Sequence, residues 1–257
     1  MDLNLDNKVY FEDAMKLLSR LKTKSIDLAI VDPPYQINAT SHRKNHSRTK
    51  LAIAKHYKTP LWDQVMPSQR YFNELLRVSR FQIIFGINYF VETRNIPIGS
   101  GRIVWDKVNG ESSYSDAEIA GTNLFKSTRI IPYMWNGMMQ GKSFKEGRVM
   151  QGDKTKNEVR IHPTQKPVEL YKALFHSFAK KGWKILDTHV GSGSIRIAAA
   201  LSGLPLIGSE MDEGHFNDQE KRWKEFVNLP RIPFPEEPKL PLHLHLKEDG
   251  IYFDYQL

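Results

Sequence analysis

The chain has 257 residues, of which 40% are hydrophobic and 26% are charged, which is enough for one α/β domain with a sizeable core. It contains no cysteine, which excludes disulfide bonds and thiolate metal sites. No apolar run approaches the roughly 18 residues of a membrane-spanning helix, and the polar residues 1–8 do not resemble a signal peptide. We therefore expect a soluble, cytoplasmic protein. The formal net charge of +8 favours a polyanionic partner.

Hydrophobic periodicity and turn residues predict alternating strands and helices along the chain. In chain order, we expect a strand and a helix within 9–21, a strand at 26–31, a helix at 68–78, strands at 82–85, 103–105, 118–125 and 129–135, a helix at 167–180, a strand at 184–186, a helix at 195–201, a strand at 205–208 and a helix at 215–226. Alternation of this kind predicts a mostly parallel sheet with helices on both faces.

Two stretches between these elements have no sustained periodicity. Residues 36–60 carry six lysines and arginines and three histidines, and a loop of this length is usually functional or disordered. Residues 137–161 are rich in glycine, lysine and polar side chains. We interpret the chain as one domain over residues 1–257, with a basic loop at 36–60 and a small insertion around 120–160.

The segment Asp32-Pro33-Pro34-Tyr35 follows the predicted strand 26–31 directly, at the carboxyl end where open α/β sheets bind ligands. These residue types suit chemistry on an exocyclic base amine, whose lone pair is delocalised into the ring. The Asp32 carboxylate and the Pro33 carbonyl can accept its two N–H bonds, and Tyr35 can stack on a base turned out of the duplex. The alternative is a rigid turn with an Asp cap and a packed Tyr, but the position after a buried strand favours the chemical interpretation.

A second segment, residues 187–194, follows the predicted strand 184–186 and reads Asp-Thr-His-Val-Gly-Ser-Gly-Ser. Gly191 and Gly193 allow the backbone to approach a ligand closely. Glu210 follows the next predicted strand, where an acid commonly binds ribose hydroxyls. Taken alone, this segment fits a dinucleotide site or a plain strand–turn–helix corner equally well, and Arg196 stands where Gly-x-Gly-x-x-Gly would have its third glycine.

Together, the two segments resemble the DNA amino-methyltransferases. Asp32 to Tyr35 matches the Asp-Pro-Pro-Tyr of that family, and residues 187–194 resemble its cofactor loop, Asp-Pro-Phe-x-Gly-Ser-Gly-Thr. Residues 162–167 are similar to the His-Pro-Thr-Gln-Lys-Pro of one subgroup, and Glu12-Asp13 resembles an acidic pair whose Asp meets the cofactor adenine. The catalytic segment precedes the cofactor loop, as it does in the permuted β class.

The resemblance implies a Rossmann-like S-adenosylmethionine-dependent methyltransferase fold. Its sheet would be mostly parallel and seven-stranded, with helices on both faces and a circularly permuted motif order. In this fold the strands that carry Asp32 and Asp187 are neighbours. The implied function is site-specific methylation of double-stranded DNA, with transfer of a methyl group from S-adenosylmethionine to N6 of a flipped adenine. The family also implies a restriction-modification context, a prokaryotic or viral origin and, by analogy alone, a homodimer.

The resemblance assigns roles to individual residues. The implied catalytic residues are Asp32, Pro33, Pro34 and Tyr35. The implied cofactor-binding residues are Asp13, Asp32, Lys166, Asp187, Thr188, His189, Gly191, Ser192, Gly193 and Glu210. Of these, Asp13 and Glu210 would hold the adenosine, and Lys166 and the 187–194 loop the methionine end. No metal is expected.

Basic side chains are candidates for DNA contacts. The first group follows the catalytic segment and consists of Arg43, Lys44, His46, Arg48 and Lys50. We expect it to contact phosphates, with a solvated charge run as the alternative. A second group lies near the insertion around 120–160, which we expect to recognise the target sequence, and consists of Arg148, Lys154, Lys156 and Arg160.

Thr188 and His189 depart from the family's Pro and Phe, and His189 either stacks as the Phe does or is structural. Asp32 favours adenine, because related enzymes that methylate N4 of cytosine more often carry Ser there. Cytosine N4 nevertheless stays an alternative, as do RNA or protein-amide methylation and a non-catalytic DNA-binding subunit. A nicotinamide oxidoreductase would leave Asp-Pro-Pro-Tyr unexplained. Methylation of cytosine carbon 5 needs a cysteine nucleophile, which this chain lacks.

Overall fold

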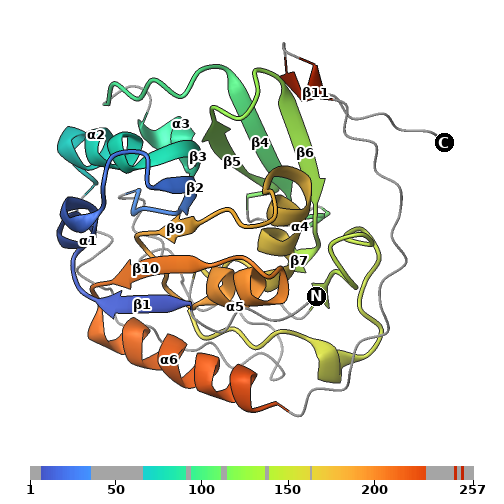
Figure 1. Cartoon of the computed structure of the whole chain (residues 1–257). Helices are drawn as coiled ribbons and strands as arrows, with labels where there is room; N and C mark the ends of the chain where they lie inside the picture. The colour runs from blue at the N-terminus through green and yellow to red at the C-terminus, as the bar shows by residue number, and fades with distance from the viewer. Residues whose placement is uncertain are drawn as a thin grey trace.

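A twisted sheet forms the centre of the protein (Figure 1). The computed structural model describes residues 7–35, 66–90, 94–110, 115–136, 139–162 and 164–229, and the backbone of 246–247 and 250–251. The strand order of the main sheet is β1-β10-β9-β2-β3-β5-β4-β6. Its strands are β1 Lys8–Phe11, β2 Ile26–Val31, β3 Ser79–Phe85, β4 Gly101–Asp106, β5 Ala117–Thr122, β6 Thr128–Pro132, β9 Ile185–Asp187 and β10 Leu206–Glu210.

The sheet is mostly parallel, as predicted, but it has eight strands rather than seven. β5 runs antiparallel to both of its neighbours, β3 and β4, and the other pairs are parallel. The strand expected at 129–135 is the edge strand β6, which pairs with β4 from Arg102↔Thr128 to Asp106↔Pro132. It joins the sheet because Ile131 is buried in the core, so adding this strand at the edge removes apolar surface from water.

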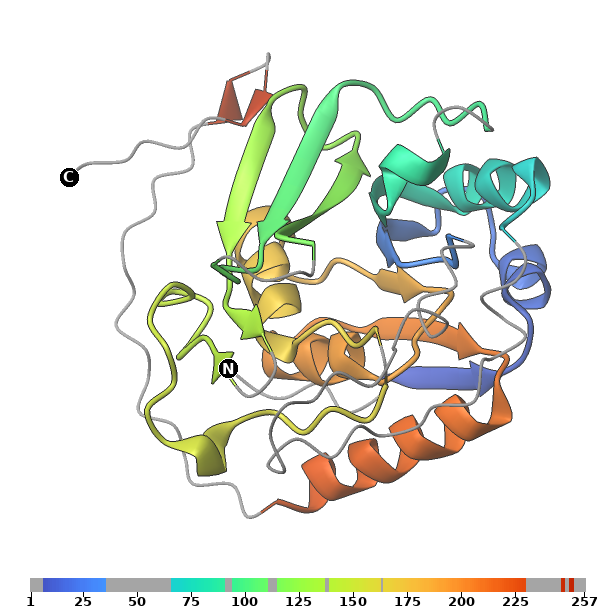
Figure 2. The ribbon, with the colours of Figure 1, turned by 180° about the vertical axis from the view of Figure 1, so that it is seen from behind.

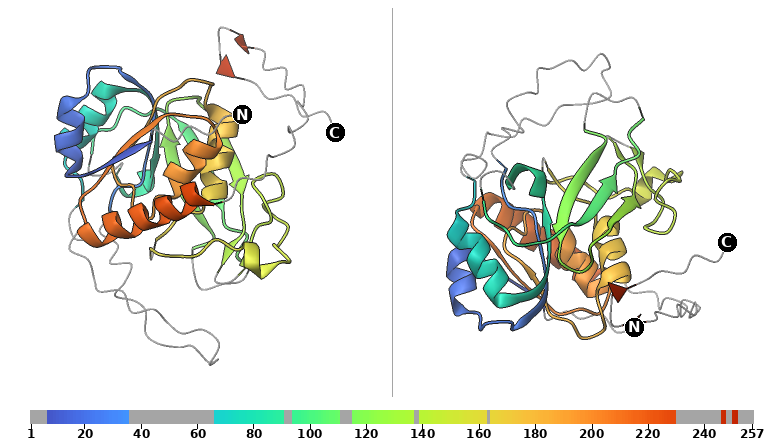
Figure 3. Two further views of the ribbon diagram at one scale, coloured as in Figure 1. Left: turned by 60° about the horizontal axis from the view of Figure 1, so that its bottom comes forward. Right: turned by 90° about the horizontal axis from the view of Figure 1, so that it is seen from above.

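Helices cover both faces of the sheet (Figures 1 and 2). On one face lie α1 Ala14–Arg20, α2 Gln69–Val78 and α3 Ile87–Phe90, and on the other lie α4 Val168–Phe178 and α5 Ser194–Leu201. The helix α6, Glu213–Asn228, packs beside α5 through Trp223 (Figure 3). Among the described residues, no helix is long and apolar enough to cross a membrane.

Short elements occupy the remaining described segments. They are the hairpin of β7 Trp135–Asn136 and β8 Met139–Gln140, the 3-10 helix η2 Lys154–Lys156, and the separate pair β11 Leu246–Lys247 and β12 Gly250–Ile251. Residues 133–162 are otherwise loop, whereas 117–132 belong largely to the main sheet. The basic loop expected at 36–60 lies outside the described residues.

The strand β2 is buried on both faces, which explains its continuous apolar sequence. Leu28 and Ile30 belong to the core cluster beneath α4, while Ala29 and Val31 belong to the cluster beneath α1 and α2. β2 pairs with β9 at Leu28↔Ile185 and Ala29↔Leu186, so the predicted neighbourhood of these two strands is confirmed.

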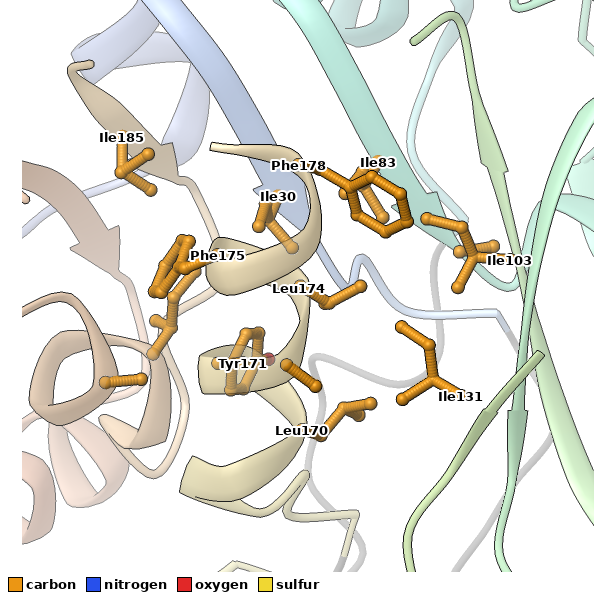
Figure 4. Packing of buried hydrophobic residues seen from close by; sticks show 14 of the residues in the cluster. Ile30, Ile83, Ile103, Ile131, Leu170, Tyr171, Leu174, Phe175, Phe178 and Ile185 are labelled. Atoms are coloured by element: carbon orange, nitrogen blue, oxygen red, sulfur yellow. The ribbon is translucent and has the colours of Figure 1, made fainter. Parts of the chain in front are cut away.

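The helix α4 is fixed to the sheet by one continuous apolar face. Leu170, Leu174 and Phe178 point toward isoleucines of the sheet, among them Ile83 and Ile103 (Figure 4). Burying each such side chain contributes about 1.5–3 kcal/mol. Because the helix begins directly after Pro167, this packing also fixes the segment that precedes the helix.

Candidate active site

Four strands end at the same edge of the sheet, and the predicted site residues follow them. The parallel registers place Gly208 opposite Asp187, and Phe11 opposite Glu210. Asp32 follows β2, which is the neighbour of β9. Since the carboxyl ends of parallel strands meet at one edge, the structure brings the segments after β1, β2, β9 and β10 together.

The turn after β9 is built on two glycines with left-handed backbones. Gly191 has φ 53° and Gly193 has φ 74°, conformations that other residues adopt only with strain. A Cβ at Gly191 would lie in ordinary contact with the His162 ring, 3.8 Å away, so the left-handed backbone rather than lack of space favours glycine there. The Gly191 backbone lies beside Glu210. Its amide donates to Glu210 Oε2 at 2.8 Å, and the Asp212 amide donates to Glu210 Oε1 at 2.9 Å. Two backbone bonds therefore fix the Glu210 carboxylate beside the turn.

Asp187 is a buried acid at the start of this turn. Its Oδ1 accepts the His189 amide at 2.9 Å, and no cation within the described residues forms an ion pair with it. Burial raises the pKa of Asp187 to about 8, because a charge is costly without a partner in a dry site. A cationic ligand group would stabilise the charged form of this carboxyl.

Thr188 and His189 form a hydrogen-bonded chain with Tyr71 of α2. The Tyr71 hydroxyl lies 2.7 Å from Thr188 Oγ1, and Thr188 Oγ1 lies 3.0 Å from His189 Nδ1. The Tyr71 and His189 rings also meet edge to face, with centroids 5.4 Å apart. Burial lowers the pKa of His189 to about 4, so its ring is uncharged near neutral pH. These polar contacts therefore accommodate Thr188 and His189 at the positions where the family has Pro and Phe.

Asp13 and Phe11 follow β1 at the same edge. Asp13 caps α1, because its Oδ1 accepts the Met15 amide at 2.8 Å. Phe11 is 53% exposed and packs against Phe216 of α6 with ring centroids 5.3 Å apart. An exposed aromatic pair thus lies beside the ends of β1 and β10, where a planar ligand group could be covered.

Asp32 lies in a row of alternating charges. The ammonium of Lys166 contacts Asp32 Oδ2 and lies 2.9 Å from Glu118 Oε2. On the far side, Lys107 Nζ lies 2.7 Å from Glu118 Oε1. Lys166, which we expected at the methionine end of a cofactor, is thus placed on the proposed catalytic carboxylate. Burial raises the pKa of Asp32 to about 6, against the lowering effect of Lys166.

Tyr35 contacts the same carboxylate and packs on α3. Its hydroxyl donates to Asp32 Oδ1. Its ring stacks on Tyr89 with centroids 5.1 Å apart and lies edge-on to Phe90 at 5.8 Å. Gly86, with φ 67°, makes this arrangement possible, because a Cβ there would overlap Cε1 of the Tyr35 ring. Both Asp32 oxygens are therefore occupied, and Pro33 is buried beside them.

The two groups of candidate DNA-binding residues differ in what the structure shows. Arg43, Lys44, His46, Arg48 and Lys50 lie outside the described residues. In the second group, Arg148 pairs with Asp106 at 2.9 Å, Lys156 pairs with Asp153 at 3.7 Å, and the Arg160 guanidinium lies over the Trp135 ring at 4.3 Å. Lys154 begins η2 and is exposed.

Comparison with known proteins gives the family. A family model described as DNA methylase matches residues 103–221. The chain is 24% identical to the type II methyltransferase M2.LlaDCHI of Lactococcus lactis subsp. cremoris over 239 residues, which are 82% of this chain and 86% of that protein. It is also 24% identical to M2.DpnII of Streptococcus pneumoniae over 235 residues, 82% of this chain and 87% of that one. These matches support a DNA methyltransferase that is similar to the N6/N4 amino-methyltransferases.

The fold of this methyltransferase agrees with a solved relative. The putative DNA modification methylase TTHA0409 of Thermus thermophilus superposes with a TM-score of 0.50 at 16% identity, over 86% of this chain and 96% of that one. The family uses S-adenosylmethionine, whose hydroxyls need acceptors and whose ammonium and sulfonium need negative charge. The fixed Glu210 carboxylate and the buried acid Asp187 meet these needs. The residues of the turn therefore fit the cofactor.

Sequence reasoning missed three side chains of this methyltransferase site. Glu118 had a usable signal, since an acid within an apolar strand is buried only where it has a partner. Tyr71 and Tyr89 had no such signal in the sequence, because an aromatic residue on a helix is usually part of the core. Their contacts with His189 and Tyr35 depend on how α2 and α3 pack against the sheet.

Proposed function

We propose that this methyltransferase acts on N6 of an adenine turned out of double-stranded DNA, with Asp32, Pro33, Pro34 and Tyr35 as its catalytic segment. The observation that supports this proposal is the position of Asp32. It follows β2 and lies at the same sheet edge as the glycine turn after β9. An acceptor for an amine and the turn proposed to bind the methyl donor therefore share one edge of the sheet.

The proposed mechanism uses two acceptors. The Asp32 carboxylate and the Pro33 carbonyl accept the two N–H bonds of the target amine, which directs the nitrogen lone pair away from the ring. Bound at the turn, S-adenosylmethionine supplies a methyl carbon made electrophilic by its sulfonium. The amine loses one proton as it gains the methyl group, and Asp32 would receive it. Tyr35 stacks on the extruded base, an interaction of about 1–3 kcal/mol.

The Tyr35 hydroxyl occupies one oxygen of Asp32. The target amine needs that carboxylate as an acceptor, so the ring must move when the base enters. The carboxyl at position 32 favours adenine over cytosine, where Ser is more common in related enzymes. Mass analysis of nucleosides from treated DNA tests this choice, since N6-methyladenine supports it and N4-methylcytosine overturns it.

The test of the catalytic role is Asp32→Asn. This change keeps the shape but removes the negative charge, one of the two acceptor oxygens and the site that would take up the proton, so methyl transfer should fall by at least about a thousandfold. Calorimetry should still show S-adenosylmethionine binding, because the glycine turn and Glu210 are unchanged.

Asp27→Asn is the matched control, because Asp27 lies at the opposite end of the same strand and accepts the Lys184 amide at 2.9 Å. It should retain activity. Full activity in the Asp32 variant would refute the assignment.

A further inference from the structure

Glu118 interacts with the proposed catalytic carboxylate of Asp32 through a lysine that both acids contact. It lies on β5, the antiparallel strand of the sheet, and is joined to Asp32 only through Lys166. The Lys166 side chain is 3% exposed, so its ammonium has almost no water to solvate it. A buried ammonium between two carboxylates must divide its hydrogen bonds between them.

The row continues on the far side of Glu118 with Lys107, at the end of β4. The order along the row is acid, base, acid, base, so the four formal charges sum to zero. Burial alone would raise the pKa of Glu118, but Lys166 and Lys107 together lower it to about 2, so Glu118 is charged at any working pH. A permanently charged carboxylate therefore competes with Asp32 for the Lys166 ammonium.

We propose that Glu118 is a positioning residue for Asp32, which it orients through the shared Lys166 ammonium while limiting how strongly Lys166 neutralises the catalytic carboxylate. This inference rests on the proposed role of Asp32. A carboxylate bound by an ammonium alone is a weaker acceptor for the target amine and a weaker base for its proton. Sharing the ammonium leaves Asp32 a better acceptor, and the fixed Lys166 still holds one of its oxygens in place.

Other titratable groups face Asp32 from the elements around it. They are Tyr35 of its own segment, Tyr71 of α2, Tyr171 of α4 and Asp187 of β9. Burial raises the pKa of Tyr71 and of Tyr171 well above the usual value, so both rings are uncharged in the working range. Burial also raises the pKa of Asp187 to about 8, so this acid is mostly protonated at neutral pH in the free protein. Lys166, Glu118 and Lys107 thus dominate the field at Asp32.

Two opposite changes follow for the pKa of Asp32. Glu118→Gln keeps the shape and an acceptor for Lys166 but removes the like charge, so the pKa should fall by about one pH unit. Lys107→Gln removes a positive charge that lowers the pKa of Asp32, so the pKa should rise. Glu118→Asp keeps the charge with a shorter reach and should leave the pKa close to that of the wild type.

The measurement is a ¹³C NMR titration of labelled aspartate carboxyls in the free, full-length protein, with Asp32→Asn to identify the signal. The pH profile of kcat/KM for DNA should show the same shifts in its acidic limb, since it reports groups of the free enzyme. Turnover of Glu118→Gln should fall by about ten- to a hundredfold, with partial recovery in Glu118→Asp.

An Asp32 signal that titrates identically in wild type, Glu118→Gln and Lys107→Gln would overturn the positioning role. Lys107 is partly exposed, so its variant carries the test if Glu118→Gln does not fold. Retained methyl transfer in Asp32→Asn would instead refute the proposed function. In that case the NMR titration would still decide whether Glu118 acts on Asp32.

Discussion

Burial holds the imidazole of His189 in one tautomer. Tyr71 is buried, and within the described residues its hydroxyl contacts Thr188 alone, so leaving its proton without an acceptor would be costly. The arrangement that satisfies all three groups has Tyr71 donating to Thr188, and Thr188 donating to His189 Nδ1. His189 then carries its proton on Nε2. The pair Thr188-His189 thus replaces Pro-Phe with an uncharged ring of similar shape.

His189→Phe should change how stability depends on pH. The pKa of His189 is lowered from 6.5 to about 4 in the folded protein. Its neutral form therefore favours folding above pH 6.5, and this contribution is lost as the pH falls toward 4. Without the histidine, the free energy of unfolding should fall less steeply over that range, by up to about 1.4 kcal/mol per pH unit. Urea unfolding of both proteins at several pH values measures the difference, and parallel curves would contradict it.

At the scale of elements, Glu158 connects the segment 139–162 to three helices near the glycine turn, α4, α5 and α6. Its Oε1 accepts from Arg222 of α6 at 2.7 Å and from Ser194, the first residue of α5, at 3.1 Å. Its Oε2 accepts the Val168 amide at the start of α4, at 2.8 Å. The segment 139–162 is thereby fixed to the elements around the glycine turn, which we propose to bind the methyl donor.

Glu158→Gln should loosen that connection. The side chains of Glu158 and Arg222 are 16% and 14% exposed, so removing one charge leaves the other buried and should cost about 3 kcal/mol. Hydrogen exchange should rise in 139–162 and at the start of α5, but not in α1.

The control for this change lies in the same segment. Glu146→Gln breaks an exposed ion pair with Lys142 and should cost under about 1 kcal/mol. Equal behaviour of the two variants would show that Glu158 has no special role.

The helices and strands could be predicted from the sequence more completely than the contacts within the site. Hydrophobic periodicity and turn residues were sufficient to predict β2, α4 and the glycine turn, because each is encoded within about a dozen neighbouring residues. The row from Asp32 through Lys166 to Glu118 was not predictable, since its members come from three distant parts of the chain. Only the order of strands in the sheet brings them together, and local patterns contain no such information. A strand at 129–135 was predicted, but only its pairing as β6 with β4 shows that the sheet has eight strands rather than seven.

At the scale of the whole molecule, the net charge of +8 should govern DNA binding. If the loop basic residues contact phosphates, changing Arg43, Lys44 and Arg48 to Gln should reduce the slope of log affinity against log salt by up to about 3. The control variant changes Lys22, Lys181 and Lys184 to Gln. These lysines are exposed near the opposite edge of the sheet, and the control has the same net charge as the loop variant. Binding measured between low and moderate salt compares the two variants, and equal slopes would place the phosphate contacts elsewhere.

The pairing of β2 with β9 has a consequence for synthesis on the ribosome. β2 is among the first parts to emerge and β9 among the last of the core, so a partly made polypeptide has the acceptor half of the site without the donor half. On the proposed roles of these segments, a chain that ends before β9 should therefore be inactive. Two separately expressed pieces, divided between β5 and β9, should recover methylation only when they assemble.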